Sequence, residues 1–136
     1  MAFRPLLAAT FEGGDDYLKL QFPLLASPKL DGIRVICHQE MGAITRSCKE
    51  VPNKYIREFL SDTKLWYLDG EILVGDPTDP DVFNKTQSAV MTQAGEPDFQ
   101  YYAFDSYGPF YTCPFSTRLD DTANIINALP DNLRDR

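Results

Sequence analysis

The sequence contains very little histidine, little cysteine and no long apolar run, and each shortage excludes a kind of site. His38 is the only histidine among 136 residues, so a Ser-His-Asp triad or a multi-histidine metal site would have to be built around it. Cys37, Cys48 and Cys113 lack C-x-x-C spacing, which favours reduced thiols over disulfides or a zinc site. No apolar run approaches the roughly 20 residues of a membrane span. We therefore expect a cytoplasmic protein without membrane contact.

Basic residues are also in short supply. The chain has 13 Lys and Arg against 20 Asp and Glu, which gives a net charge of −7. A free-standing nucleic-acid-binding module usually carries a basic face, so the charge counts against that class. It leaves open an enzyme fragment whose contacts with DNA come from another segment. The length and a hydrophobic content of 43% indicate one globular domain with a core.

The hydrophobic pattern predicts an α+β fold, with antiparallel sheets and flanking helices. Strands are expected at 21–27, 33–40, 44–47, 65–75 and 99–107, and helices at 53–62, 81–91 and 116–129. Asn53 is placed to cap the first of these helices, and Ser116 or Thr117 to cap the last. Strands and helices do not alternate regularly, which favours antiparallel over parallel pairing.

The segment PKLDGIRVI, residues 28–36, combines a turn signal with two cationic side chains. Asp31-Gly32 predicts a hairpin between strands at 24–30 and 33–37, which would place Lys29 and Arg34 near each other at one end of the sheet. An amine and a guanidinium beside a glycine turn suit a phosphate. The alternative is a plain hairpin that carries a solvated lysine.

Four further motifs accompany KLDGIR in a fixed order: TRS at 45–47, LDGEILV at 68–74, YYAFDSY at 101–107 and PFSTR at 114–118. Together they resemble the covalent nucleotidyltransferases, which comprise ATP-dependent DNA ligases, RNA ligases and mRNA-capping guanylyltransferases. The closest similarity is to phage-type ATP-dependent DNA ligases. The resemblance implies the ligase and capping-enzyme nucleotidyltransferase fold, which is ATP-grasp-like.

The same resemblance implies roles for individual residues. Lys29 would attack the α-phosphate of ATP and hold AMP as a phosphoramidate. Arg34 and Arg46 would contact the ribose and phosphate side of the nucleotide. Glu71 would bind the ribose or a Mg²⁺ ion, since carboxylates accept hydrogen bonds and hold hard cations. Phe104 would stack on the adenine.

The sequence departs from the ligase pattern in two places. Ligases often carry an acidic residue two positions before the nucleophilic lysine, whereas this chain has Ser27, and backbone groups near Pro28 and Leu30 would then help to select the adenine. After Arg118 there is no E-G-x-x-x-K or K-x-K motif, and the oligonucleotide-binding domain is absent. Residues 1–136 are therefore expected to form a partial adenylylation domain, incomplete at its C-terminus.

The resemblance implies a monomeric DNA ligase fragment that uses ATP and Mg²⁺ to seal nicks in double-stranded DNA during replication, repair and recombination. Its grip on nicked DNA would come from segments that these residues lack, and its setting would be a bacterial cell or a phage-infected host. Two alternatives remain open. One is an RNA ligase or mRNA-capping guanylyltransferase, and the other is a non-catalytic remnant that binds nucleotide or protein.

Overall fold

A four-stranded antiparallel sheet forms the centre of the computed structural model, which describes residues 3–136. The strands are β1 (Ile33–His38), β2 (Gly42–Thr45), β3 (Leu68–Leu73) and β4 (Gln100–Ser106), in the spatial order β2-β1-β3-β4. Each neighbouring pair is antiparallel. The α+β class with antiparallel pairing, predicted from the pattern, is confirmed.

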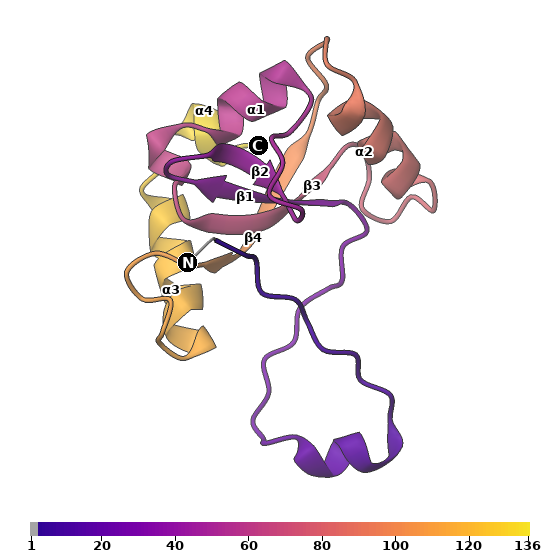
Figure 1. Cartoon of the computed structure of the whole chain (residues 1–136), viewed down its shortest axis with the longest axis vertical. Helices are drawn as coiled ribbons and strands as arrows, with labels where there is room; N and C mark the ends of the chain where they lie inside the picture. The colour runs from indigo at the N-terminus through magenta and orange to yellow at the C-terminus, as the bar shows by residue number, and fades with distance from the viewer. Residues whose placement is uncertain (1–2) are drawn as a thin grey trace.

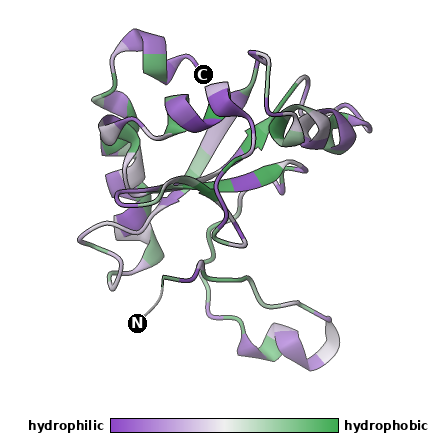
Figure 2. Cartoon of the chain, turned by 45° about the horizontal axis from the view of Figure 1, so that its top comes forward, coloured by the Kyte–Doolittle hydropathy of each residue, from purple (hydrophilic) through white to green (hydrophobic). Residues whose placement is uncertain are grey.

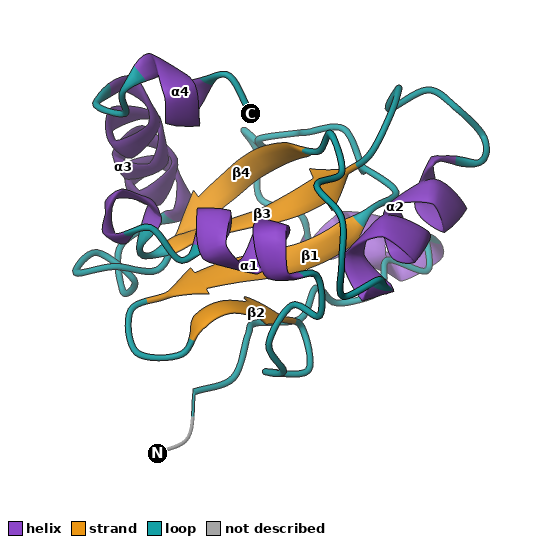
Figure 3. Cartoon of the chain, turned by 90° about the horizontal axis from the view of Figure 1, so that it is seen from above, coloured by secondary structure: helices purple, strands orange, loops and turns teal. Residues whose placement is uncertain are grey.

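Helices surround this sheet on several sides (Figure 3). They are α1 (Lys54–Leu60), α2 (Val82–Met91), α3 (Phe115–Asn127) and α4 (Asp131–Arg134), with short 3-10 helices η1 (Gly14–Lys19) and η2 (Thr63–Leu65). Helix α1 lies over the sheet, α3 and α4 lie beside β4, and α2 lies away from them at the other end (Figure 3). Within residues 3–136, no helix combines the length and apolarity needed to cross a bilayer.

The core lies between one face of the sheet and α1. Val35 and Cys37 alternate along β1 and are fully buried, and Ile72 of β3 joins them. Ile56 and Leu60, one helical turn apart on α1, close this layer from above. The alternate residues of β1 and β3 therefore point to the opposite face, where the polar motif residues lie.

Asn53 ties the start of α1 to the loop after α2. The residue is fully buried, and its side-chain oxygen accepts a hydrogen bond from the Ile56 amide at 2.9 Å, as the predicted cap requires. Its amide group donates to the carbonyls of Thr92, at 2.9 Å, and of Gly95, at 3.3 Å. One side chain therefore satisfies donors and acceptors on two segments that are far apart in sequence.

We expect Asn53→Ala to destabilise the fold by about 2–4 kcal/mol, because it removes a helix cap and the hydrogen bonds that hold the loop after α2. Urea unfolding followed by circular dichroism would measure this loss. Asp62→Ala, which removes the cap of the short helix η2, is the matched control and should have a smaller effect. Equal losses in the two variants would contradict the assigned role of Asn53.

The first 30 residues differ most from the prediction. The expected strand at 21–27 does not form, and β1 pairs with β2 and β3 rather than with residues 24–30, so the predicted Asp31-Gly32 hairpin is wrong. Residues 5–30, here called the arm, instead leave the sheet as a long loop that carries η1 (Figure 1). The reason is that an extended segment becomes a strand only when another backbone supplies hydrogen bonds.

The other boundaries shift by a few residues. Helix α3 begins at Phe115, after Pro114, and no side chain caps it, so the predicted cap at Ser116 or Thr117 is wrong. The carbonyl of Pro114 instead accepts the first backbone hydrogen bond, from the Thr117 amide at 3.0 Å. The segment 63–65, expected to lead into a strand, forms η2, and β3 starts at Leu68.

Candidate functional site

Arg34 is held on the polar face of the sheet by β3. The register places Arg34 opposite Glu71 and Ile36 opposite Asp69. The Arg34 guanidinium donates to both carboxylate oxygens of Asp69, at 2.9 and 2.5 Å, in a fork that fits a carboxylate. Its remaining nitrogen donates to the Leu6 carbonyl at 2.7 Å. This fork therefore fixes the arginine rather than leaving it to rotate.

A β-bulge places Phe104 beside this arginine. Along the pairing of β3 with β4, Asp69 faces Asp105 and Gly70 faces Ala103, so Phe104 is the extra residue between them. A bulge redirects the side chain that it carries. The Arg34 guanidinium carbon lies 5.7 Å from the centre of the Phe104 ring, within the range of a cation–π contact.

A second ion pair fixes the neighbouring strand. Arg118 of α3 donates to both oxygens of Asp105, at 2.8 and 3.0 Å. Two carboxylates thus stand opposite each other on β3 and β4, and each is compensated by an arginine from a different element. Like charges placed directly across a sheet repel, so both arginines stabilise this part of the fold.

Glu71 forms the floor of the site. Its Oε1 accepts a hydrogen bond from the Gly32 amide at 3.2 Å, which links the second Asp-Gly motif to the first. Burial raises the pKa of Glu71 above its ordinary value, while the Gly32 amide and the positive charges of Lys29 and Arg34 act in the opposite direction. The amine of Lys29 is therefore within electrostatic reach of this carboxylate.

A hollow of about 480 Å³ opens over these residues. It is lined by Gly32, Ile33, Arg34, Thr45, Arg46, Ser47 and Glu71. Cavities of this size accommodate small ligands and cofactors such as nucleotides. The turn after β2 presents Arg46, so three of the predicted contact residues, from three strands or strand ends, meet in one hollow.

The arm carries the other predicted residues. Lys29, Ser27 and Pro28 are exposed and lie outside the lining of this hollow, and Leu30 is half-buried. The positive charge of Lys29, three residues before Gly32, acts to lower the pKa of Glu71. The structure thus brings Arg34, Arg46 and Glu71 together, with Phe104 beside Arg34. It does not bring Lys29 into the lining of the hollow.

Sequence reasoning missed Asp69 as the partner of Arg34. The signal was present, because Asp69 and Glu71 are two residues apart on one strand and therefore share a face. An antiparallel pairing of 33–38 with 68–73 would have predicted the contact, but the hairpin interpretation assigned β1 a different partner. The contribution of the Leu6 carbonyl has no such signal, since it depends on the path of the arm.

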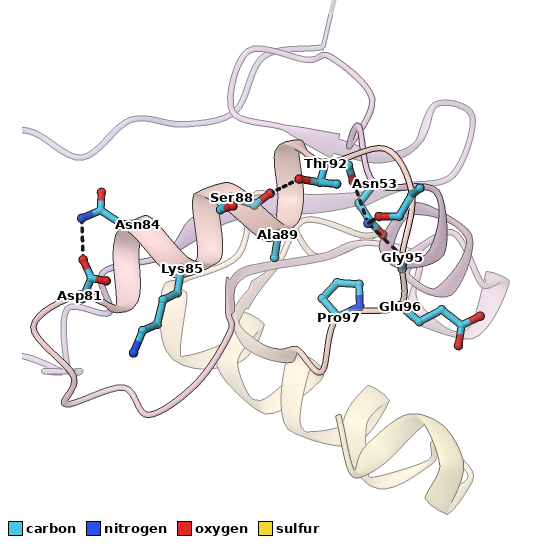
Figure 4. Close-up of a pocket in the computed structure, with 11 residues that line it drawn as sticks. Asn53, Asp81, Asn84, Lys85, Ser88, Ala89, Thr92, Gly95, Glu96 and Pro97 are labelled. Atoms are coloured by element: carbon cyan, nitrogen blue, oxygen red, sulfur yellow. Dashed lines mark hydrogen bonds between the residues drawn. The ribbon is translucent and has the colours of Figure 1, made fainter.

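A larger hollow of about 690 Å³ lies elsewhere, between α2 and the loop that follows it (Figure 4). Lys85 and Ala89 of α2 line one side, Glu96 and Pro97 the other, and Asn53 lies at the end near Gly95 (Figure 4). None of the predicted site residues lines it. Its size alone therefore gives no reason to prefer it over the smaller hollow that holds the motif residues.

The half-buried carboxylate of Glu71 predicts a pH dependence of stability. A folded-state pKa raised above the ordinary value of 4.5 stabilises the fold below that value, and this contribution is lost as the pH rises through the folded pKa. We therefore expect the wild type to lose stability relative to Glu71→Gln over this pH window. Urea unfolding across the window measures the difference, with Glu58→Gln on the exposed side of α1 as control. Parallel profiles for the wild type and Glu71→Gln would contradict the assignment.

The chain matches no protein-family model and no curated protein. Among solved structures, it is similar to the crystal structure of Chlorella virus DNA ligase-adenylate, with 33% sequence identity and a TM-score of 0.75. That match covers 93% of this chain and 44% of the viral one. A second crystal structure of this ligase-adenylate gives 33% identity and a TM-score of 0.73, over 91% of this chain and 42% of the other.

This likeness confirms the fold that the motifs implied. The sheet and its helices match the ligase nucleotidyltransferase fold, and the chain spans less than half the length of the ligase that it resembles. At 33% identity the similarity extends to sequence as well as shape.

Proposed function

We propose that this chain, which has the ligase nucleotidyltransferase fold over part of its length, is the first part of an ATP-dependent DNA ligase adenylylation domain and carries the nucleophile and one wall of its nucleotide site. The observation that supports the proposal most is the hollow lined by Arg34, Arg46 and Glu71, together with the charge of Lys29, which acts on Glu71. It brings together residues from three separate motifs, which the sequence alone could only place in order.

The proposed first step is transfer of AMP to the lysine. The neutral amine of Lys29 attacks the α-phosphorus of ATP, because only the uncharged form has a free electron pair. A nitrogen–phosphorus bond forms while the bond to the bridging oxygen breaks, pyrophosphate leaves with that electron pair, and the amine proton passes to solvent. Arg46 would attract the phosphates, and Phe104 would offer its ring face to the base.

Arg34 would act differently from the role first expected of it. Its guanidinium is engaged by Asp69 and by the Leu6 carbonyl, so its contribution is to fix positive charge beneath the nucleotide. Direct contact between Arg34 and a ribose or phosphate stays a prediction. A preorganised charge stabilises a transition state without reorganising during the reaction, which suits phosphoryl transfer.

The residues present fit a Mg²⁺ ion that is held jointly with substrate. Within residues 3–136, no group of three or more acidic, histidine or cysteine side chains could hold a metal ion. Mg²⁺ is commonly bound by one or two carboxylates together with substrate phosphates, and Glu71 supplies such a carboxylate. When bound, the ion would neutralise charge on the phosphates.

If the enzyme is a DNA ligase, the molecule that accepts AMP from the lysine is nicked DNA. In the proposed later steps, the 5′-phosphate at a nick takes AMP from Lys29, and the neighbouring 3′-hydroxyl then displaces AMP to seal the strand. The net charge of −7 indicates that the grip on DNA would come largely from segments outside these residues. The name of the structural neighbour favours DNA over RNA as the acceptor.

Labelled ATP tests the proposal. The chain, fused to the part of the Chlorella virus ligase that has no counterpart in it, is incubated with α-labelled ATP and Mg²⁺. We expect an acid-labile protein label that Lys29→Ala abolishes and that Lys19→Ala, an exposed lysine of the same arm, retains. An absence of label in the fusion would overturn the proposal, and a preference for GTP would favour the capping enzymes.

A further inference from the structure

Residues 3–6, here called the N-terminal segment, cross the polar face of the sheet before the chain continues into the arm. Arg34 and His38 share this face, because side chains alternate along β1. The segment contacts both of them: the Phe3 ring packs on His38, and the Leu6 carbonyl accepts a hydrogen bond from Arg34 at 2.7 Å. The segment therefore runs antiparallel to β1, on the side of the sheet away from α1 (Figure 2).

Phe3 anchors the N-terminal segment against two rings that are themselves held in place. Its ring centre lies 4.7 Å from that of His38, edge to face, and 5.2 Å from that of Tyr107. The His38 ring accepts hydrogen bonds from two backbone amides of the turn after β1, at 3.1 and 3.2 Å. The Tyr107 hydroxyl donates to the Cys37 carbonyl at 3.1 Å. Aromatic pairs at such distances attract each other beyond the burial of their surface, so Phe3 docks on rigid partners.

The N-terminal segment also contacts the turn that presents Arg46. The Cys48 thiol donates to the Phe3 carbonyl, with sulfur and oxygen 3.7 Å apart. Cys48 has a φ of +57°, and its amide donates to the Thr45 carbonyl at 2.8 Å, which closes a tight turn around Arg46. Thiols are weak donors, so this contact is weaker than the one at Arg34. Two cationic residues that line the hollow, Arg34 and Arg46, therefore border the same short segment.

Leu6 contributes to the site through its backbone rather than its side chain. The Leu6 side chain is 82% exposed, whereas its carbonyl contacts Arg34. The position of this carbonyl therefore depends on the anchor at Phe3. Pro5 lies between the two residues, and its fixed φ stiffens the connection. A displacement at Phe3 would consequently be transmitted to the carbonyl that holds Arg34.

We propose that Phe3 is a positioning residue of the nucleotide site. Its ring, docked on His38 and Tyr107, holds the N-terminal segment across the sheet. The carbonyls of that segment then hold Arg34 and the turn at Arg46. Both arginines keep their orientation before a nucleotide arrives, which is the preorganisation that electrostatic stabilisation requires. What the arginines act on rests on the proposed function, whereas the positioning of Arg34 does not depend on ATP.

The guanidinium group of Arg34 tests the positioning in the isolated chain, without ATP. NMR spectroscopy measures how fast its hydrogens exchange with water. We expect Phe3→Ala to speed this exchange at least about tenfold, the factor that corresponds to the loss of one hydrogen bond to a charged group. Phe3→Tyr keeps the ring and should exchange as the wild type does. Phe11→Ala is the matched control, because Phe11 packs on Tyr17 of the arm, with ring centres 4.8 Å apart. Amide exchange of β1 and β3 reports that the sheet is folded in each variant.

Labelling of the fusion protein with α-labelled ATP tests the consequence for the site. We expect Phe3→Ala to raise the ATP concentration at half-maximal labelling rate by about tenfold, because misplaced arginines bind the nucleotide less well. The final amount of label should stay unchanged, since every molecule keeps Lys29. A purely structural role would do the reverse, because a loss of folded protein lowers the amount of label and leaves the half-saturating concentration unchanged. Phe3→Tyr and Phe11→Ala should label as the wild type does.

Each other outcome decides against the proposal or against the function on which it rests. Unchanged exchange at Arg34 in Phe3→Ala, with a folded sheet, would overturn the proposal. Faster exchange with an unchanged dependence on ATP would overturn it too, because the N-terminal segment would then hold Arg34 without serving the nucleotide site. A wild-type fusion that forms no label would refute the proposed function, and the exchange at Arg34 would still decide whether Phe3 positions the arginine.

Discussion

Gly32→Ala is expected to destabilise the fold by at least about 3 kcal/mol, because the added methyl group has no space. A Cβ at this position would lie 2.1 Å from the Ile72 carbonyl oxygen of β3 and 3.0 Å from Cγ of Glu71. The first of these contacts is with backbone in the centre of the sheet, so no side-chain rotation relieves it. To accommodate alanine, β1 would have to move away from β3.

The change also reaches the site directly. The Gly32 amide donates to Glu71, and this hydrogen bond would lengthen or break if β1 moved. In the labelling experiment with the fusion protein, we therefore expect Gly32→Ala to abolish the AMP label on Lys29 as well as to lower stability. The reason is that Gly32 joins the arm to the hollow.

Urea unfolding at neutral pH measures the effect, with Gly75→Ala as the matched control. Gly75 has a φ of +97° and nothing within 4 Å of an added Cβ, so its substitution introduces backbone strain alone, about 1–2 kcal/mol. If the two variants lose the same stability, close approach to Ile72 is not the reason for glycine at position 32.

Gly32 also shows which part of the fold could be predicted from the sequence and which could not. The Asp-Gly pair was correctly identified as a special backbone position, but the turn rule assigned it to a hairpin. The actual requirement is close approach to a strand that follows 36 residues later, at Leu68. Strand partners depend on tertiary packing, and local residue preference does not contain that information.

The elements that were predicted well are those whose pattern is complete within a short window. Helix α2 begins one residue from the predicted start and ends where predicted, and Asn53 caps α1 as expected. The strand predicted at 21–27 does not form for a different reason, because its pattern is sound but no partner strand lies within these residues. The fork between Arg34 and Asp69 required the register of β1 on β3, which no single motif provides.

The second large prediction concerns the ion pair of Arg34 with Asp69. Both side chains are mostly buried, with 21 and 11% of their surfaces exposed. Removing one partner leaves an uncompensated charge in a mostly buried environment, which typically destabilises the folded protein by about 3–5 kcal/mol. Arg34→Ala should be especially harmful, because Asp69 would then face Asp105 across the sheet with only Arg118 to compensate them.

A double-mutant cycle separates this pairing from other effects of the two substitutions. We expect Arg34→Ala/Asp69→Ala to be less destabilised than the sum of the single variants by about 1–3 kcal/mol, since the double variant buries no unpaired charge. The exposed pair of Arg134 with Asp131 is the matched control, and its coupling should stay below about 1 kcal/mol because water screens it. Additive losses at Arg34 and Asp69 would mean that the fork does not stabilise the sheet. A nucleotide contact would then be the better explanation for the arginine in KLDGIR.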